Sequence, residues 1–169
     1  MIAKATIEDI PQIVALLNSA YRGEGSKQGW TTEADLIAGE QRSDAASVTE
    51  VLNQPGSIIL KYTHDNGQII GTVNLQEHER GLYLGMFAVS PMLQGGGIGK
   101  QLLKAADEYA KEVSVATIYM SVISVRKELI DWYKRHGYAE TGERKPFVED
   151  DITGKHLQPL EFLVLEKNI

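Results

Sequence analysis

Apolar side chains in the first third of the chain recur with helical spacing after one short strand. Residues 2–6 predict that strand, and one apolar stripe follows at Ile10, Ile13, Val14, Leu17 and Tyr21. A glycine-rich stretch at 22–30 predicts a loop. Thr32-x-x-Asp35 then has the form of a capping box. We therefore expect a second helix, in one or two pieces, from there to Asn53.

The period becomes extended after Pro55-Gly56. Residues 57–62 predict a strand, 65–67 a tight turn and 68–76 the returning strand of a hairpin. Arg80-Gly81 forms a further turn before a third strand over 82–89. The middle of the chain is thus predicted to be an antiparallel meander.

Helical and extended segments alternate in the remainder of the chain. Apolar residues near four-residue intervals predict a helix, at Ile98, Leu102, Ala106, Tyr109 and Val113. A buried strand is expected over 116–123, a helix over 126–135 that ends at Gly137, and strands over 138–143 and 160–165, with a polar linker at 144–159. The predicted fold class is α/β: one domain over 1–169 with a mixed sheet, an antiparallel meander followed by a parallel strand-helix-strand unit, and helices on both faces.

Composition removes several classes of function. The chain has 169 residues, 43% of them hydrophobic, and no cysteine, which excludes a thiol nucleophile, a disulfide framework and a Cys-type zinc site. Its four histidines have no ligand-like spacing, so no metal is expected. The net charge of −6 argues against a nucleic-acid partner. The N-terminal residues lack a signal-like apolar run and no stretch suits a membrane span, so a cytoplasmic protein without a membrane partner is expected.

A glycine-rich turn at residues 94–99 lies between a predicted strand and a predicted helix. Glycines permit positive φ there, and the unpaired N–H groups of a helix's first turn favour an anion such as phosphate. The Walker A pattern fails at Gln94 and Gln101, and a GxGxxG fingerprint fails from either Gly95 or Gly97. What remains is Gln-x-x-Gly-x-Gly. The alternative is that the glycines merely close a tight connection, at a considerable cost in unfolded-state entropy.

This turn resembles the acetyl-CoA-binding motif of the GNAT superfamily of N-acetyltransferases, [Arg/Gln]-x-x-Gly-x-[Gly/Ala]. The resemblance continues through 124–138, which is similar to the family's second conserved block and ends in Tyr133, three residues and Gly137-Tyr138. The two blocks cover about a third of the chain, and the order of predicted elements fits the family over nearly all of it. The resemblance implies acetyl-CoA as cosubstrate, without a metal.

The same resemblance implies roles for individual residues. The strand that includes Met86, Phe87, Ala88 and Val89 would bind the pantetheine arm, and the pyrophosphate would be held by Gln94, Gly95, Gly96, Gly97, Ile98 and Gly99. Lys100 and Lys104 either approach the phosphates or form a solvated pair. Tyr133 matches the position of the general acid that protonates the CoA thiolate, the alternative being a packed core aromatic. Many relatives carry an asparagine where this chain has Arg126, so Arg126 and Ser124 are weaker candidates for cofactor contact.

Acetyl transfer to an amine also needs a proton acceptor, because an amine with a pKa near 10.4 is mostly protonated at neutral pH. Glu77 lies at the end of one strand of the meander, and the resemblance implies that the region around Glu33 borders the acceptor cleft, so both are candidates. Each is otherwise a solvated surface residue, the usual state of such side chains.

The acceptor implied by the resemblance is a primary amine of a small molecule or a protein. Residues 1–84 hold 6 Lys+Arg against 11 Asp+Glu, which favours a cationic amine if this half lines the acceptor cleft. The loop with Trp30 would admit it, unless Trp30 is a packing anchor. With no cysteine for an acyl intermediate, direct transfer in a ternary complex is simplest. The alternatives are a non-catalytic acyl-CoA-binding sensor or regulatory module, and a nucleotide-binding protein of another class. The chain is expected to be a monomer or a homodimer.

Overall fold

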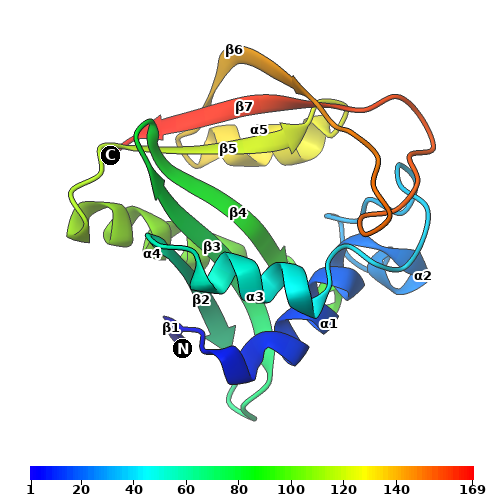
Figure 1. The fold of residues 1–169 in the computed structure, drawn as a ribbon, viewed down its shortest axis with the longest axis horizontal. Coiled ribbons are helices and arrows are strands. Elements are labelled where there is room, and N and C mark those ends of the chain that lie inside the picture. The colour runs from blue at the N-terminus through cyan, green and yellow to red at the C-terminus, as the bar shows by residue number, and fades with distance from the viewer.

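Seven strands of the computed structural model, which describes residues 1–23 and 25–169, join in one sheet with the order β1-β2-β3-β4-β5-β7-β6 (Figure 1). All neighbouring pairs are antiparallel except β4 and β5, which are parallel. The strands are β1 (Ile2–Lys4), β2 (Ser57–Thr63), β3 (Ile69–His78), β4 (Gly81–Val89), β5 (Thr117–Ile123), β6 (Ala139–Pro146) and β7 (Glu161–Asn168).

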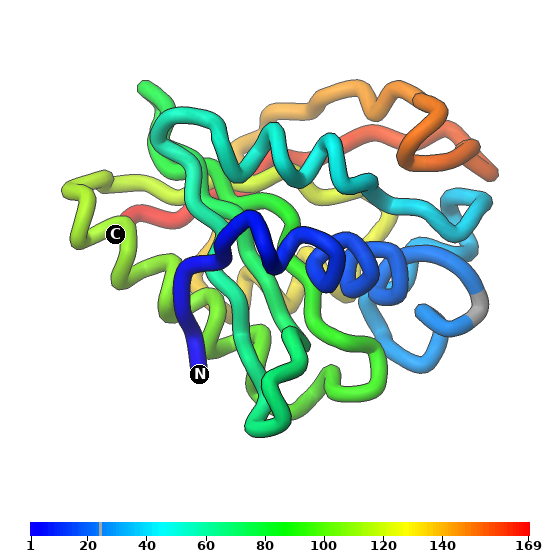
Figure 2. Tube along the Cα trace, turned by 60° about the horizontal axis from the view of Figure 1, so that its bottom comes forward, coloured from blue at the N-terminus to red at the C-terminus, as the bar shows by residue number. Residues whose placement is uncertain are grey.

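Helices cover both faces of this sheet, as the sequence predicts. They are α1 (Ile10–Tyr21), α2 (Gly23–Ser26), α3 (Ala45–Asn53), α4 (Ile98–Glu112) and α5 (Lys127–Arg135), with 3₁₀ turns η1 (Ile7–Asp9) and η2 (Pro91–Leu93). Neighbouring strand residues point to opposite faces: Ile59 and Ile69 pack with α1 and α3, while Leu60 and Ile70 pack with α4 and α5. The tube in Figure 2 shows α1 running across its face of the sheet.

The feature that shapes the site is the divergence of β4 from β5. Their parallel register includes only Leu82 with Ile118 and Tyr83 with Tyr119. The register of β4 against β3 then shifts, and Met86 adopts a positive φ of 47°, as in a β-bulge. The bulge bends β4 away from its neighbour (Figure 1). From residue 85 onward, the edge of β4 that faces β5 has no strand partner in this register.

The meander, the parallel unit and the mixed sheet are confirmed, but one predicted helix start is wrong. Residues 31–44 form turns, and the helix begins at Ala45, where the Asp44 carboxylate accepts from the Ser47 N–H at 2.8 Å. The Thr32 hydroxyl caps only a local turn, because Gly39 has a φ of 100° and Ala38 donates to the Lys155 carbonyl at 2.7 Å. These long-range ties override the local capping signal.

Smaller differences concern element ends. The predicted loop at 22–30 contains the one-turn helix α2, and its Glu24 lies outside the described residues. Strands β3, β6 and β7 extend two or three residues beyond their predicted ends at Gln76, Glu143 and Leu165. The polar linker is therefore shorter, and it lies beside residues 22–44, where the Arg22 Nε donates to the Thr153 carbonyl at 2.9 Å (Figures 1 and 2).

Candidate active site

The glycine turn ends in a helix start that is open to a ligand. Gly95 and Gly97 have positive φ values of 90° and 84°, and a Cβ on either would meet nothing within 4 Å. Backbone conformation is thus what requires glycine at both positions. The first helical hydrogen bond runs from the Gln101 N–H to the Gly97 carbonyl at 3.1 Å. The N–H groups of the preceding turn lack helical acceptors, so this end of α4 suits an anion.

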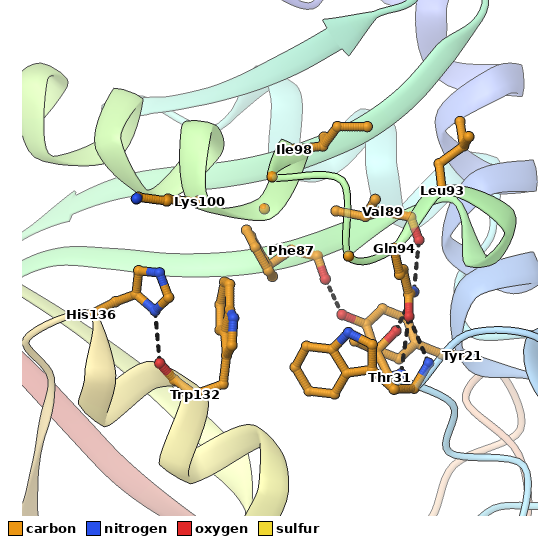
Figure 3. Close-up of a pocket in the computed structure, with 14 residues that line it drawn as sticks. Tyr21, Thr31, Phe87, Val89, Leu93, Gln94, Ile98, Lys100, Trp132 and His136 are labelled. Carbon is orange, nitrogen blue, oxygen red and sulfur yellow. Dashed lines mark hydrogen bonds between the residues drawn. The ribbon is translucent and has the colours of Figure 1, made fainter.

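Gln94 fastens this turn to the loop that follows α2. Its side-chain oxygen accepts from the N–H groups of Trp30 at 2.8 Å and Thr31 at 3.2 Å. Its amide nitrogen donates to the Val89 carbonyl at 3.0 Å and the Thr31 hydroxyl at 2.6 Å (Figure 3). A Cβ on Gly29 would lie 2.4 Å from the Gln94 side-chain oxygen, so any larger residue there would displace the Gln94 side chain. The Gln94 side chain therefore joins two loops, which leaves the backbone of the turn as the group that faces a ligand.

A first cavity of about 300 Å³ lies between the start of α4 and the α5 helix. Its walls are aromatic, with Trp132 5.9 Å from Trp30 and 4.4 Å from His136 between ring centroids. The glycine turn and Lys100 line the same cavity (Figure 3). Apolar walls that end at a cluster of N–H groups suit an extended apolar chain with a phosphate attached.

A second cavity of about 350 Å³ fills the divergence of β4 and β5. It is lined from β4 by Met86 and Phe87, from β5 by residues 120–123, and from α5 by Tyr133. Tyr21 and Phe87 line both cavities, so the two spaces meet at these residues. The Tyr21 hydroxyl donates to the Phe87 carbonyl, which fixes α1 to the bent strand.

Tyr133 lines the second cavity, next to Phe87, which lines both. Its side chain is buried, with its ring centroid 6.1 Å from that of Phe87 and 5.9 Å from that of Tyr138. Burial raises the pKa of Tyr133 well above its usual value, and the neighbouring Tyr21 raises it further. No hydrogen bond joins the Tyr133 hydroxyl to a residue of 1–23 or 25–169. A protonated phenol with a free hydroxyl therefore faces the second cavity.

A buried ion-pair network forms part of the lining of the second cavity. The Glu33 carboxylate lies 2.5 Å from the Arg22 guanidinium and 3.2 Å from that of Arg126. Arg126 also donates to the Thr31 carbonyl at 2.5 Å. Burial lowers the pKa of Arg22, and the Glu33 charge opposes that change. Glu33 is thus not a solvated surface residue, and both of its oxygens are engaged.

The structure brings most predicted site residues together, but not all of them. Glu33, Met86, Phe87, Val89, Arg126 and Tyr133 line one or both cavities, as do Gln94, Gly95, Gly97, Ile98, Gly99 and Lys100. Ala88 points to the α1 face, because it alternates with Phe87 along the strand. Gly96, Lys104 and Ser124 line neither cavity, and Ser124 donates its N–H to the Glu161 carbonyl at 2.8 Å. Glu77 is exposed and packs against Gly56, outside both cavities.

Sequence reasoning missed Arg22 and Arg42, both of which fall in segments predicted as loop or helix without a chemical role. No local motif marks either residue. Within 1–23 and 25–169, no group of three or more His, Asp or Glu side chains could hold a metal ion. In the same residues, no helix has both the length and the apolar character that crossing a bilayer requires.

A splayed parallel strand pair, an open strand edge and a glycine turn that begins a helix together define the class of acyl-CoA-dependent acyltransferases. The family model for the acetyltransferase (GNAT) domain matches residues 26–157. The chain belongs to this family, whose members are acetyl-CoA-dependent N-acetyltransferases.

Solved structures share the fold. The ribosomal-protein-S18-alanine N-acetyltransferase from Escherichia coli has a TM-score of 0.74 and 15% identity over 100% of this chain and 93% of its own. A ribosomal-protein-alanine N-acetyltransferase from Brucella melitensis has a TM-score of 0.72 and 22% identity, over 100% of this chain and 99% of its own. An IAA acetyltransferase from Bacillus cereus has a TM-score of 0.69 and 18% identity, over 100% of this chain and 99% of its own. No curated protein matches the sequence.

Proposed function

We propose that this protein transfers an acetyl group from acetyl-CoA directly to a primary amine, and that Tyr133 is the general acid. The observation that carries the proposal is the junction of the two cavities. The phosphate-suited turn opens on one cavity, the Tyr133 hydroxyl faces the other, and Phe87 lines both. A donor bound at the turn can thus extend its acyl end to Tyr133.

Donor binding uses backbone groups of two elements. The edge of β4 over residues 85–89, left without a strand partner by the bulge, would pair with the amides of the pantetheine arm. The N–H groups of Ile98, Gly99 and Lys100 would hold the pyrophosphate, and the Lys100 ammonium adds positive charge beside it. Both sites are largely preformed, because Gln94 already fixes the glycine turn and the Tyr21 hydroxyl already fixes the bent part of β4.

The chemistry then needs one bond to form and one to break. The amine nitrogen attacks the thioester carbon, and the carbon–sulfur bond breaks. The departing thiolate accepts a hydrogen bond from the Tyr133 hydroxyl and takes its proton, which the proton released by the amine then replaces through water. The raised pKa of Tyr133 keeps that proton in place across the neutral range. Among the described residues, Glu33 is the only carboxylate that lines the second cavity, and both of its oxygens are already engaged by arginine side chains. We therefore assign removal of the amine proton to water.

The test is Tyr133→Phe, with release of CoA thiol measured against a panel of amines. We expect kcat to fall about 10²- to 10⁴-fold, the usual contribution of a positioned acid, with an unchanged Kd for acetyl-CoA. Tyr138→Phe is the matched control, because Tyr138 contacts the Tyr133 ring but lines neither cavity. Wild-type kcat in Tyr133→Phe would refute the assignment.

The same measurements separate the other two functions. An acyl-CoA-binding sensor or regulatory module would be stabilised by acetyl-CoA but would release no thiol with any amine. A nucleotide-binding protein of another class would gain more thermal stability from ATP or NAD than from acetyl-CoA.

A further inference from the structure

The charges that line the second cavity are more positive than the chain as a whole. Among the described residues, its charged lining consists of Glu33, Arg42 and Arg126. The Glu33 charge is already compensated by Arg22 and Arg126. Two guanidinium groups therefore compensate this one carboxylate, and the Arg42 guanidinium is an additional cation in the lining. The other acidic residues of 1–23 and 25–84 do not line this cavity, so the summed charge of the first half of the chain does not describe the site.

Arg42 is the cation of this set that has no carboxylate partner in the described chain. Its guanidinium carbon lies 5.7 Å from the centre of the Tyr21 ring, a cation–π distance, and the residue is half-buried. No side-chain hydrogen bond or ion pair of Arg42 with residues 1–23 or 25–169 is formed. The side chain is nevertheless placed, because the Asn18 side-chain oxygen accepts from the backbone N–H of Arg42 at 2.5 Å and that of Ser43 at 2.9 Å.

Asp150, in the linker beside this site, does not neutralise Arg42. Its carboxylate accepts from the N–H groups of Thr153 at 2.6 Å and Ile152 at 2.8 Å. These bonds, that of Thr153 foremost, lower the pKa of Asp150 against the opposing effect of burial, and Arg42 adds only a smaller contribution. The Asp150 oxygens form no ion pair with Arg42 within 4.0 Å. A planar guanidinium with unused donors therefore faces the cavity, and such a group binds carboxylates through paired hydrogen bonds.

Building on the function proposed above, we infer that the acceptor is a small amino acid-like molecule, and that Arg42 binds its carboxylate. A volume of about 350 Å³, which must also admit the thioester, is near the lower limit for ligand sites and favours a small molecule. The arginine excess favours an anionic group on it. Arg42 lines the second cavity and not the first, so its role concerns the acceptor and not the donor.

Matched pairs of compounds test this inference. Free amino acids, including ω-amino acids, are compared with their carboxamides, and tetrapeptides with an acidic N-terminal residue form a third arm. CoA release gives kcat/KM for each compound. We expect carboxylates to exceed their amides by about ten- to hundredfold, the range for a hydrogen bond to a charged group. Arg42→Gln should bring the carboxylate-to-amide ratio close to one, and Arg42→Lys should restore part of the preference. Arg80→Gln, which removes an exposed ion pair with Glu143, is the control and should retain the wild-type ratio.

A binding measurement keeps the inference testable without turnover. With CoA present, free amino acids of the panel should raise Tm more in the wild type than in Arg42→Gln, whereas acetyl-CoA alone should raise both equally. The role of Arg42 would be overturned if the carboxylate-to-amide ratio of kcat/KM were equal in the wild type and in Arg42→Gln. It would also be overturned if every amino acid of the panel raised the Tm of both proteins equally. A preference for acidic peptides over free amino acids would overturn the small acceptor. If acetyl-CoA did not raise the Tm of the wild type, the proposed function itself would be refuted.

Discussion

Replacing Glu33 by glutamine tests whether this carboxylate serves the fold or the chemistry. The side chain of Arg22 is 0% exposed, and those of Glu33 and Arg126 are 10% and 9% exposed. Glutamine keeps the shape of glutamate but removes the charge that compensates two guanidinium groups. The variant therefore leaves two buried cations without a counter-charge.

The size of the effect follows from this burial. Removing one partner of a buried ion pair costs about 3–5 kcal/mol, because the remaining charge stays desolvated. For a domain of this length, each kcal/mol lowers Tm by about 2–4 °C, so a decrease of about 6–20 °C is expected. Glu140→Gln is the matched control, since Lys134 and Glu140 are 2.6 Å apart but 41% and 43% exposed. An exposed pair contributes about 0–1 kcal/mol.

Urea unfolding followed by tryptophan fluorescence measures both variants, and CoA release measures their activity. A Glu33→Gln variant that stays within about 1 kcal/mol of the wild type in the free energy of unfolding would refute the structural role. If that stable variant also lost kcat by 10²-fold or more, Glu33 would be the general base, as its position in the sequence first suggested.

Two further predictions concern the glycine turn and the buried tyrosines. Gly97→Ala should lower the free energy of unfolding by about 1–2 kcal/mol and weaken acetyl-CoA binding, because the φ of 84° at this position strains any L-residue. Gly96→Ala should change the free energy of unfolding by less than about 0.5 kcal/mol. Equal melting temperatures for the two variants would contradict this prediction. Burial raises the pKa of Tyr21 to about 12 and also raises those of Tyr133 and Tyr138, so the folded chain keeps protons that the unfolded chain loses above pH 10. The free energy of unfolding should therefore fall as the pH rises from about 10 to 12, by about 1.4 kcal/mol per pH unit for each tyrosine. A midpoint of urea unfolding that stays constant up to pH 11 would contradict this pH dependence.

Local patterns in the sequence determined most of the fold. The meander, the α4 helix and the parallel unit follow from apolar periodicity and turn residues, because each signal lies within one element and its neighbours. The glycine turn and Tyr133 were identified as candidate site residues through motif spacing and a family resemblance. The capping signal at Thr32 misled because Ala38 and Ile37 pair with the distant residues Lys155 and His156. Local propensity cannot register such pairing.

The sequence by itself thus determined the fold class, the family resemblance and the candidate donor turn. Only the tertiary structure decided which charges face the acceptor cavity. Summed over residues 1–84, acidic side chains outnumber basic ones and suggest a cationic substrate. In the folded chain, Glu33 is buried between two arginines and Arg42 remains without a carboxylate, so the local balance is positive. The physical reason is that electrostatic interactions depend on distance and burial, and both are set by contacts between residues far apart in the sequence.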